Sequence, residues 1–167
     1  DLREIETSVS FETICSGAAD VIMDRCNTAI GRKPRIIFAI AALGGQAYYD
    51  TRAAGNGLKK GTVTYAEALR LVKGAHDISS ALGKRLVVLA QVVLHGEQDF
   101  SNGTTVENYM RALNQWQSDF ETDCQYITGQ KEPIPQYVTQ VNRGGTSIGV
   151  VANPAIAQLE APKQNHK

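Results

Sequence analysis

The chain contains, near its middle, the stretch Leu86-Val-Val-Leu-Ala-Gln-Val-Val-Leu94-His95-Gly96-Glu97-Gln98-Asp99, in which an apolar run ends abruptly in a compact polar group. A continuous apolar run of this kind is typical of a strand that is buried on both faces of a parallel sheet. Ligands of such sheets bind at the carboxyl ends of the strands, because loops and helix N-termini converge there. The stretch therefore predicts an α/β fold and also where its site lies.

Strand and helix signals alternate on either side of this stretch. The apolar run Arg35 to Leu43 lies between Pro34 and Gly44-Gly45 and predicts a central strand, and Lys84 to Leu94 predicts the next one. Between them, the capping box Thr64-x-x-Glu67 and an apolar stripe predict a helix over 65–82. The other expected elements are a helix capped by Thr104-x-x-Glu107 that carries Tyr109, Met110, Leu113, Trp116 and Phe120, a strand over 136–141, a helix from Asn153-Pro154, and an early helix over about 11–28. This order predicts a three-layer, doubly wound parallel sheet.

Length and charge limit the class of protein. With 167 residues, the chain is expected to form a single domain, 1–167, around a substantial core. Its 17 basic and 17 acidic residues give a net charge of +0, and no segment concentrates basic side chains, so we expect neither a nucleic-acid nor a membrane partner. The apolar runs fall far short of the roughly 20 residues that span a bilayer. Because the chain begins Asp-Leu-Arg, a targeting segment can precede it, and composition leaves the localisation open.

The cysteines point to no metal or redox chemistry. Cys15, Cys26 and Cys124 show no Cys-x-x-Cys or Cys/His metal spacing. Cys15 and Cys26 fall about three turns apart on one predicted helix, which is too far for a disulfide. We therefore expect three small buried hydrophobic side chains and no metal site.

Two glycine-containing segments follow the predicted strands, and we expect both at the same sheet edge. Gly44-Gly45-Gln46 follows the first strand and His95-Gly96-Glu97 follows the second. A glycine N–H and a neighbouring side-chain donor could form an oxyanion hole, which predicts acyl transfer. A plain turn at Gly44-Gly45 and a structural, hydrogen-bonded His95 are the alternatives. Glu97, followed by Asp99, favours a functional site, because a carboxylate near a buried strand end must be hydrogen-bonded to a group that it holds in position.

These residues carry a family resemblance. His95-Gly-Glu-Gln-Asp99 resembles the Gln-Gly-Glu-Ser-Asp block of the sialate O-acetylesterase-like branch of the SGNH hydrolases, with His95 where glutamine is commoner. The upstream Gly44-Gly45, the intervening helix, Thr128-Gly129-Gln130 and Pro135 to Gln140 resemble the neighbouring family segments in order and approximate spacing. The resemblance extends over most of the chain.

The resemblance implies a serine esterase that removes acetyl groups from carbohydrate without a metal or organic cofactor. It also implies an SGNH or flavodoxin-like three-layer fold and slightly favours a secreted or virion-associated location. Gly45 N–H and the side chain of His95 would bind the oxyanion, and Glu97 would orient the loop. The residues expected to contact the acetylated carbohydrate are Gly44, Gln46, Gly96 and Asp99.

The sequence departs from the family pattern at both ends. The family nucleophile belongs to a Gly-x-Ser block, and none occurs before Arg35. The family base belongs to an Asp-x-x-His block, whereas the chain closes on Asn165-His166-Lys167. Nucleophile and base act as a unit, so their loss would remove most of the rate acceleration. Our hypothesis is that the chain is the middle of a longer esterase domain, completed by the rest of its own polypeptide or by a companion chain.

Two other function classes stay open. The first is a catalytically silent glycan-binding or structural module, such as part of a phage tail protein. The second is a flavodoxin-like domain that binds a phosphate-bearing ligand, although no Gly-x-Gly-x-x-Gly or Walker loop follows a strand. Asn56-Gly-Leu-Lys-Lys-Gly61 is interpreted as a solvated connection whose lysines form a mobile rim to the cleft.

Overall fold

The computed structural model describes residues 14–31, 34–49, 57–141 and 152–164. The chain divides into two compact units, Asp1–Phe38 and Ala39–Lys167. The first unit contains helix α1 (Ile14–Ile30), in which Ala19 is buried. The predicted helix over 11–28 is therefore found from residue 14 onward, and residues 11–13 lie outside the described part of the chain.

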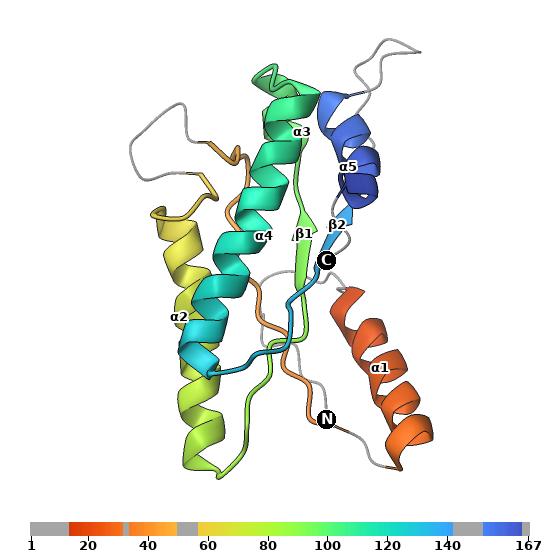
Figure 1. Ribbon diagram of the computed structural model, residues 1–167, viewed down its shortest axis with the longest axis vertical. Helices are drawn as coiled ribbons and strands as arrows, with labels where there is room; N and C mark the ends of the chain where they lie inside the picture. The colour runs from red at the N-terminus through yellow and green to blue at the C-terminus, as the bar shows by residue number, and fades with distance from the viewer. Residues whose placement is uncertain (1–13, 32–33, 50–56, 142–151, 165–167) are drawn as a thin grey trace. The chain divides into compact units, whose positions relative to one another are not determined.

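The second unit contains the remaining described elements. In chain order these are α2 (Val63–Ala81), β1 (Gln91–Leu94), α3 (Glu97–Ser101), α4 (Val106–Thr128), β2 (Gln136–Thr139) and α5 (Asn153–Gln164) (Figure 1). Strands β1 and β2 pair in parallel, with Val93 opposite Val138. Parallel neighbours require a long crossover connection, which α3 and α4 provide here.

The predicted three-layer, doubly wound sheet is wrong, and with it the SGNH or flavodoxin-like architecture. The described residues are mostly helical, and their sheet consists of β1 and β2 alone. Residues 35–43, the expected central strand, run without regular strand pairing. Ile40 and Leu43 of this segment are 65% and 50% exposed. An apolar run becomes a central strand only when neighbours occupy its edges and layers cover both of its faces, and the described elements do not supply these.

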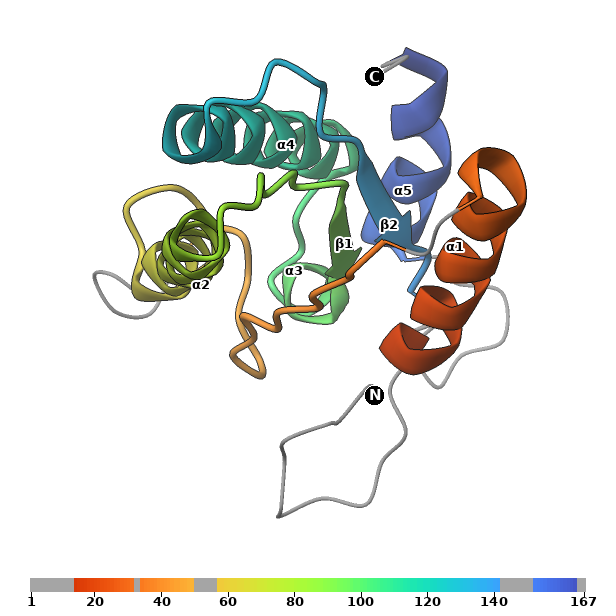
Figure 2. The same cartoon turned by 90° about the horizontal axis from the view of Figure 1, so that it is seen from below.

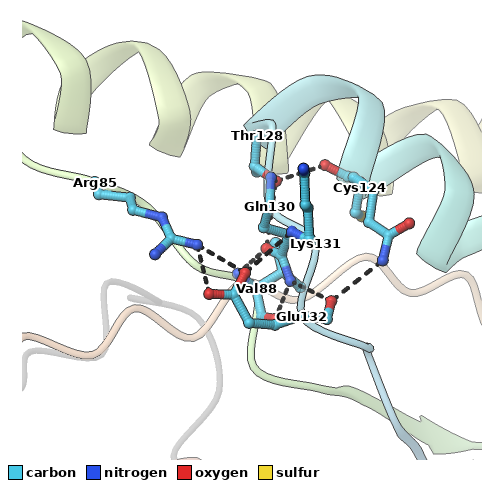
Figure 3. A network of polar contacts seen from close by, with 8 residues as sticks. Arg85, Val88, Cys124, Thr128, Gln130, Lys131 and Glu132 are labelled. Atoms are coloured by element: carbon cyan, nitrogen blue, oxygen red, sulfur yellow. Dashed lines mark hydrogen bonds and ion pairs between the residues drawn. The ribbon is translucent and has the colours of Figure 1, made fainter.

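The predicted strand over 84–94 forms a strand only at Gln91–Leu94. At Val88, before this strand, a side chain makes the backbone bonds that a neighbouring strand would make. Val88 N–H donates to Gln130 Oε1 over 2.7 Å, and Gln130 Nε2 donates to the Val88 carbonyl over 3.1 Å (Figure 3). Gln130 Nε2 also lies 3.2 Å from the Glu132 carbonyl. We call Val88, Thr128, Gln130 and Glu132 the Gln130 network. One carboxamide thus makes the two bonds that a neighbouring strand would make.

The helices begin at different caps from those predicted. Thr62, not Thr64, caps α2, and its hydroxyl accepts from Tyr65 N–H over 3.3 Å. Thr105, not Thr104, caps α4 by accepting from Asn108 N–H over 3.2 Å. Either threonine of each pair could satisfy the orphan amides of a first turn, so the local pattern does not separate them.

Helix α4 is central to the packing of the second unit. In Figure 2, α2 lies beneath one end of α4, and the strand pair and α5 lie toward its other end. One cluster joins the first half of α4 to α5 and β2, and another joins its second half to α2. Their members are Tyr109, Met110, Leu113, Ala157 and Val138 in the first, and Phe120, Cys124, Ile134, Leu69 and Val72 in the second.

The cysteines agree only in part with the expectation of three buried thiols. Cys124 is buried and free, and burial raises the pKa of its thiol to about 12. Cys26 is free and half-buried. The side chain of Cys15 lies outside the described residues. Within the described ranges, no helix is both long enough and apolar enough to span a membrane.

Candidate functional site

The candidate site lies at the carboxyl end of β1, where the chain turns into α3 through Gly96. Gly96 has φ +136°, a conformation that side-chain-bearing residues rarely adopt. A Cβ at this position would lie 3.1 Å from Pro154 Cβ and 3.2 Å from both Gln158 Nε2 and the Tyr109 hydroxyl. The turn therefore requires glycine, and it brings α4 and α5 against the backbone of His95.

His95 is 9% exposed, and its ring bonds to the protein through both nitrogens. Nε2 lies 3.0 Å from the Gln46 carbonyl, which can only accept, so Nε2 carries a hydrogen. Burial lowers the pKa of His95, and the nearby Asp99 charge opposes this shift. The ring is therefore neutral near pH 7, and Nδ1 accepts from the Tyr109 hydroxyl over 2.8 Å. The Trp116 ring lies edge-on to the imidazole, with a centroid distance of 5.6 Å.

Asp99 is the buried carboxylate of the site, at 1% exposed. Its Oδ2 accepts from Tyr48 N–H over 2.9 Å, and its Oδ1 accepts from the Thr104 hydroxyl over 2.9 Å. Oδ2 also lies 3.4 Å from His95 Nε2. Asp99 thus ties the segment that follows the first apolar run to the loop before α4. Thr104 therefore contacts Asp99, while the next residue, Thr105, caps α4.

Tyr109 and Gln158 complete the arrangement around the His95 carbonyl. That carbonyl accepts from Gln158 Nε2 over 2.6 Å and lies 3.0 Å from the Tyr109 hydroxyl. Gln158 Oε1 accepts from Val141 N–H over 2.8 Å. Burial raises the pKa of Tyr109, so the phenol keeps its proton for Nδ1. We call His95, Asp99, Tyr109 and Gln158, with the backbone of Gln46 and Tyr48, the His95 network.

The structure brings some of the predicted site residues together and leaves others apart. The Gln46 carbonyl meets His95, and Gly96 forms the turn beside it. Gly44 and Gly45 are exposed, and Gly45 has φ +69° with open space around it. Gln46 Nε2 bends back to the Gly44 carbonyl over 3.4 Å, as in a local turn.

Glu97 does not occupy the position that its place in the sequence suggested. It is exposed in the first turn of α3, and its backbone carbonyl accepts from the Ser101 hydroxyl. Asp99, two residues later, is the carboxylate that holds a loop. One helical turn returns position 99 to the side of His95, whereas position 97 points to solvent.

Sequence reasoning missed several contributors to the network. Tyr109 was assigned to an apolar helix stripe, although its hydroxyl is the partner of His95 Nδ1. Gln158 gave one usable signal, since a carboxamide on the buried side of a helix must find a partner. Tyr48 acts through its backbone N–H, which no side-chain pattern reveals.

The connection before α2 is more firmly held than predicted. Leu58 and Lys59 N–H both donate to the Tyr48 carbonyl over 3.2 Å. Lys60, expected on a mobile rim, forms an ion pair with Asp123 at 2.7 Å. Asn56 lies outside the described residues.

The chemistry of the His95 network is that of a satisfied hydrogen-bond system. Among the described residues, every buried side-chain nitrogen or oxygen has a partner. In the same part of the chain, the recorded bonds of the His95 ring go to Gln46, Tyr109 and Asp99, and none goes to a serine or cysteine. No group of three or more His, Cys, Asp or Glu side chains there is placed to hold a metal ion.

Comparisons of this chain with family models, with curated proteins and with solved structures gave no match.

Proposed function

We propose that the chain supplies the oxyanion-hole side of a serine-type carbohydrate O-acetylesterase site. One observation carries the proposal: the Gly44-Gly45-Gln46 segment and the His95-Gly96 turn, far apart in sequence, are fastened together. The fastening consists of the bond between His95 Nε2 and the Gln46 carbonyl and the bond from Tyr48 N–H to Asp99. The resemblance of both segments to SGNH hydrolase blocks supports the same assignment.

The roles that we propose for Gly45, His95 and Asp99 follow from their solvent exposure and their hydrogen bonds. Gly45 N–H lies on an exposed, open turn and is the first oxyanion donor. His95 Nε2–H donates to Gln46 in the resting site, so it would serve as a second donor only after exchanging that partner. Asp99 is a positioning residue that holds the Gly45 turn through Tyr48. The nucleophile would come from a Gly-x-Ser block upstream of Arg35, where this sequence has none, and the base from an Asp-x-x-His block, which the sequence lacks.

The test compares the chain alone with the same chain joined to whatever its gene encodes on either side. Release of acetate from acetylated xylan and from O-acetylated sialic acid is followed, together with covalent labelling by a fluorophosphonate. The proposal expects hydrolysis and a labelled serine in the longer protein only. In that protein, His95→Ala should lower kcat by roughly 10²- to 10³-fold.

The matched control is His76→Ala, which removes the imidazole of a half-exposed histidine on α2. It should leave kcat unchanged. An unchanged kcat in His95→Ala would remove the oxyanion role of His95, and the absence of any labelled serine from the longer protein would remove the esterase.

A second candidate is a catalytically silent glycan-binding or structural module, such as part of a phage tail protein. The observation that favours it is the complete internal hydrogen bonding of the His95 ring and of Asp99. A network of this kind can be purely structural. Binding of an acetylated glycan by the longer protein without acetate release would support this alternative.

A further inference from the structure

A shallow depression of about 410 Å³ lies on the surface of the second unit, and none of the residues that line it belongs to the His95 network. It is lined by Tyr49, Arg111, Asn114, Gln115 and Ser118. The last four belong to α4 and follow one another at intervals of three, one and three residues. Such positions share one face of a helix, so α4 presents them as a single polar row.

Tyr49 stands opposite this row on a segment that is held in place at several points. The preceding residue, Tyr48, is 1% exposed, and its N–H and carbonyl are both bonded. The two tyrosine rings meet edge to face, with centroids 4.8 Å apart. Tyr48 also lies beside Trp116 of α4, at 5.7 Å between ring centroids. Tyr49, 43% exposed, is therefore an accessible aromatic ring on a rigid support.

Arg111 gives the depression its charge. Its guanidinium donates to Asn108, and within the described part of the chain no carboxylate pairs with it. The exposed arginines Arg70 and Arg85, by contrast, pair with Glu67 and Glu132 at 2.6 Å. No acidic side chain is among the five that line the depression. Gln115 also donates to Asp119 over 2.9 Å, and Arg111 is the one cation among the described residues that line the depression.

This set of groups matches one class of ligand. A guanidinium binds a carboxylate through two parallel hydrogen bonds, whereas a compact ammonium cannot match that planar geometry. Carboxamides and a hydroxyl can donate to and accept from sugar hydroxyls, and an aromatic ring can cover the apolar face of a sugar ring. A single cation is too little for a polyphosphate chain, whose binding rests on many basic contacts.

We propose that this depression binds a carboxylate-bearing sugar residue of a glycan chain. Arg111 holds the carboxylate, Tyr49 packs against the sugar ring, and Gln115 and Ser118 contact its hydroxyls. Binding here requires no nucleophile and no acetyl group, so the proposal extends beyond ester hydrolysis and stands independently of it.

The experiment titrates the chain with a tetrasaccharide of galacturonate and, separately, with neutral xylotetraose, using ¹⁵N NMR shifts and calorimetry. We expect the acidic ligand to shift amides of residues 111–118 and to bind at least about 10-fold more tightly than the neutral one. Arg111→Gln should reduce affinity for galacturonate by about 10-fold or more, and Tyr49→Leu should weaken binding of both sugars.

Two controls match these variants. Arg70→Gln removes one positive charge from an exposed site on α2, and Tyr126→Leu removes a ring that is 91% exposed on α4 itself. Both should bind like the unaltered chain. Equal affinity for the two sugars, or an Arg111→Gln variant that binds as Arg70→Gln does, overturns the proposal, as does tighter binding of a DNA oligonucleotide than of galacturonate.

Because neither ligand is acetylated, this outcome separates from that of the esterase test. Galacturonate binding by the chain, together with no acetate release by the longer protein, would keep the sugar site and remove the esterase. Acetate release by the longer protein, together with no galacturonate binding, would keep the esterase and remove the sugar site.

Discussion

Two polar networks contact the apolar run from Lys84 to Leu94, one at Val88 in its first half and one at its carboxyl end, and they differ in chemistry. The Gln130 network pairs a neutral carboxamide with the backbone of Val88, and the ion pair that Arg85 forms with Glu132 of this network stays at the surface (Figure 3). The His95 network buries an imidazole and a carboxylate. A neutral amide is sufficient to satisfy buried backbone groups, whereas buried ionisable groups are costly to desolvate. The more costly arrangement is therefore the better candidate for a functional site.

The largest difference between the two networks should appear when glycine is replaced. Gly96→Ala combines an unfavourable positive φ with contacts of 3.1 to 3.2 Å, so we expect a loss of about 4 kcal/mol in the free energy of unfolding. Gly129→Ala, next to Gln130, has φ +69° but open space around it and should lose only about 1 kcal/mol. Urea unfolding of both variants measures these values. Equal losses would show that the turn at Gly96 is not tightly enclosed.

Removal of the buried carboxylate should have the next largest effect. Asp99→Ala leaves Tyr48 N–H and the Thr104 hydroxyl without their partner, which should lower the free energy of unfolding by about 3 kcal/mol. Glu97→Ala is the matched control, because Glu97 is an exposed carboxylate on the same helix. It should change stability by less than about 0.5 kcal/mol. A larger loss at Glu97 than at Asp99 would reverse this assignment.

Introduction of a charge into the Gln130 network should lower the free energy of unfolding. Gln130→Glu replaces the donor to the Val88 carbonyl with an acceptor, and we expect a loss of about 2 kcal/mol at pH 7. Acidification should recover part of this loss relative to the unaltered chain, because a protonated carboxyl regains a donor. Gln98→Glu, at a surface position in α3, should show neither effect. A Gln130→Glu variant as stable as Gln98→Glu would mean that water replaces the amide at Val88.

The smallest expected effect is a dependence of stability on pH that originates at the His95 end. Burial lowers the pKa of folded His95 below its ordinary value of 6.5, so the unfolded chain binds more protons as pH falls through 6.5. The stability contributed by neutral His95 is therefore complete above pH 6.5 and is lost below it, by up to about 1.4 kcal/mol for each unit by which the pKa is lowered.

Chemical denaturation between pH 5 and pH 8 tests this dependence. The stability of His95→Gln should fall less steeply on acidification than that of the unaltered chain. Gln130→Ala should run parallel to the unaltered chain, since it removes no titratable group. A profile of His95→Gln that matches that of the unaltered chain would locate the protonation elsewhere.

The sequence predicted those elements whose signals are local. The helices around Tyr65 and Tyr109 are where their apolar stripes place them, and the predicted strand over 136–141 is present as Gln136–Thr139, parallel to β1. The prediction of a central strand at Arg35 to Leu43 was wrong, because an apolar run indicates burial but does not show whether neighbouring strands are present. Residues 84–90 were predicted to be part of a strand, but the backbone of Val88 bonds to the distant Gln130 side chain and not to a neighbouring strand.

The sequence identified two segments that the fold brings together, but not all of the side chains that hold them. The end of the apolar run identified His95 and Gly96, because a change from apolar to polar is visible in one sequence. The choice between Glu97 and Asp99 depended on the turn of a five-residue helix that local patterns did not predict. The contributions of Tyr48 and Gln158 come from residues about 50 and 60 positions away, which only the folded chain brings near.

The carboxamide of Gln130 has a consequence for how the two strands find their alignment. A pair of four-residue strands could slide by one position and still keep three of its four residue pairs. Such a slip would turn Val138 away from the cluster formed by Tyr109 and Leu113. It would also break both bonds between Gln130 and Val88. The Gln130 amide therefore constrains the register from outside the strands. Only one register allows both the packing of Val138 and the bonds between Gln130 and Val88.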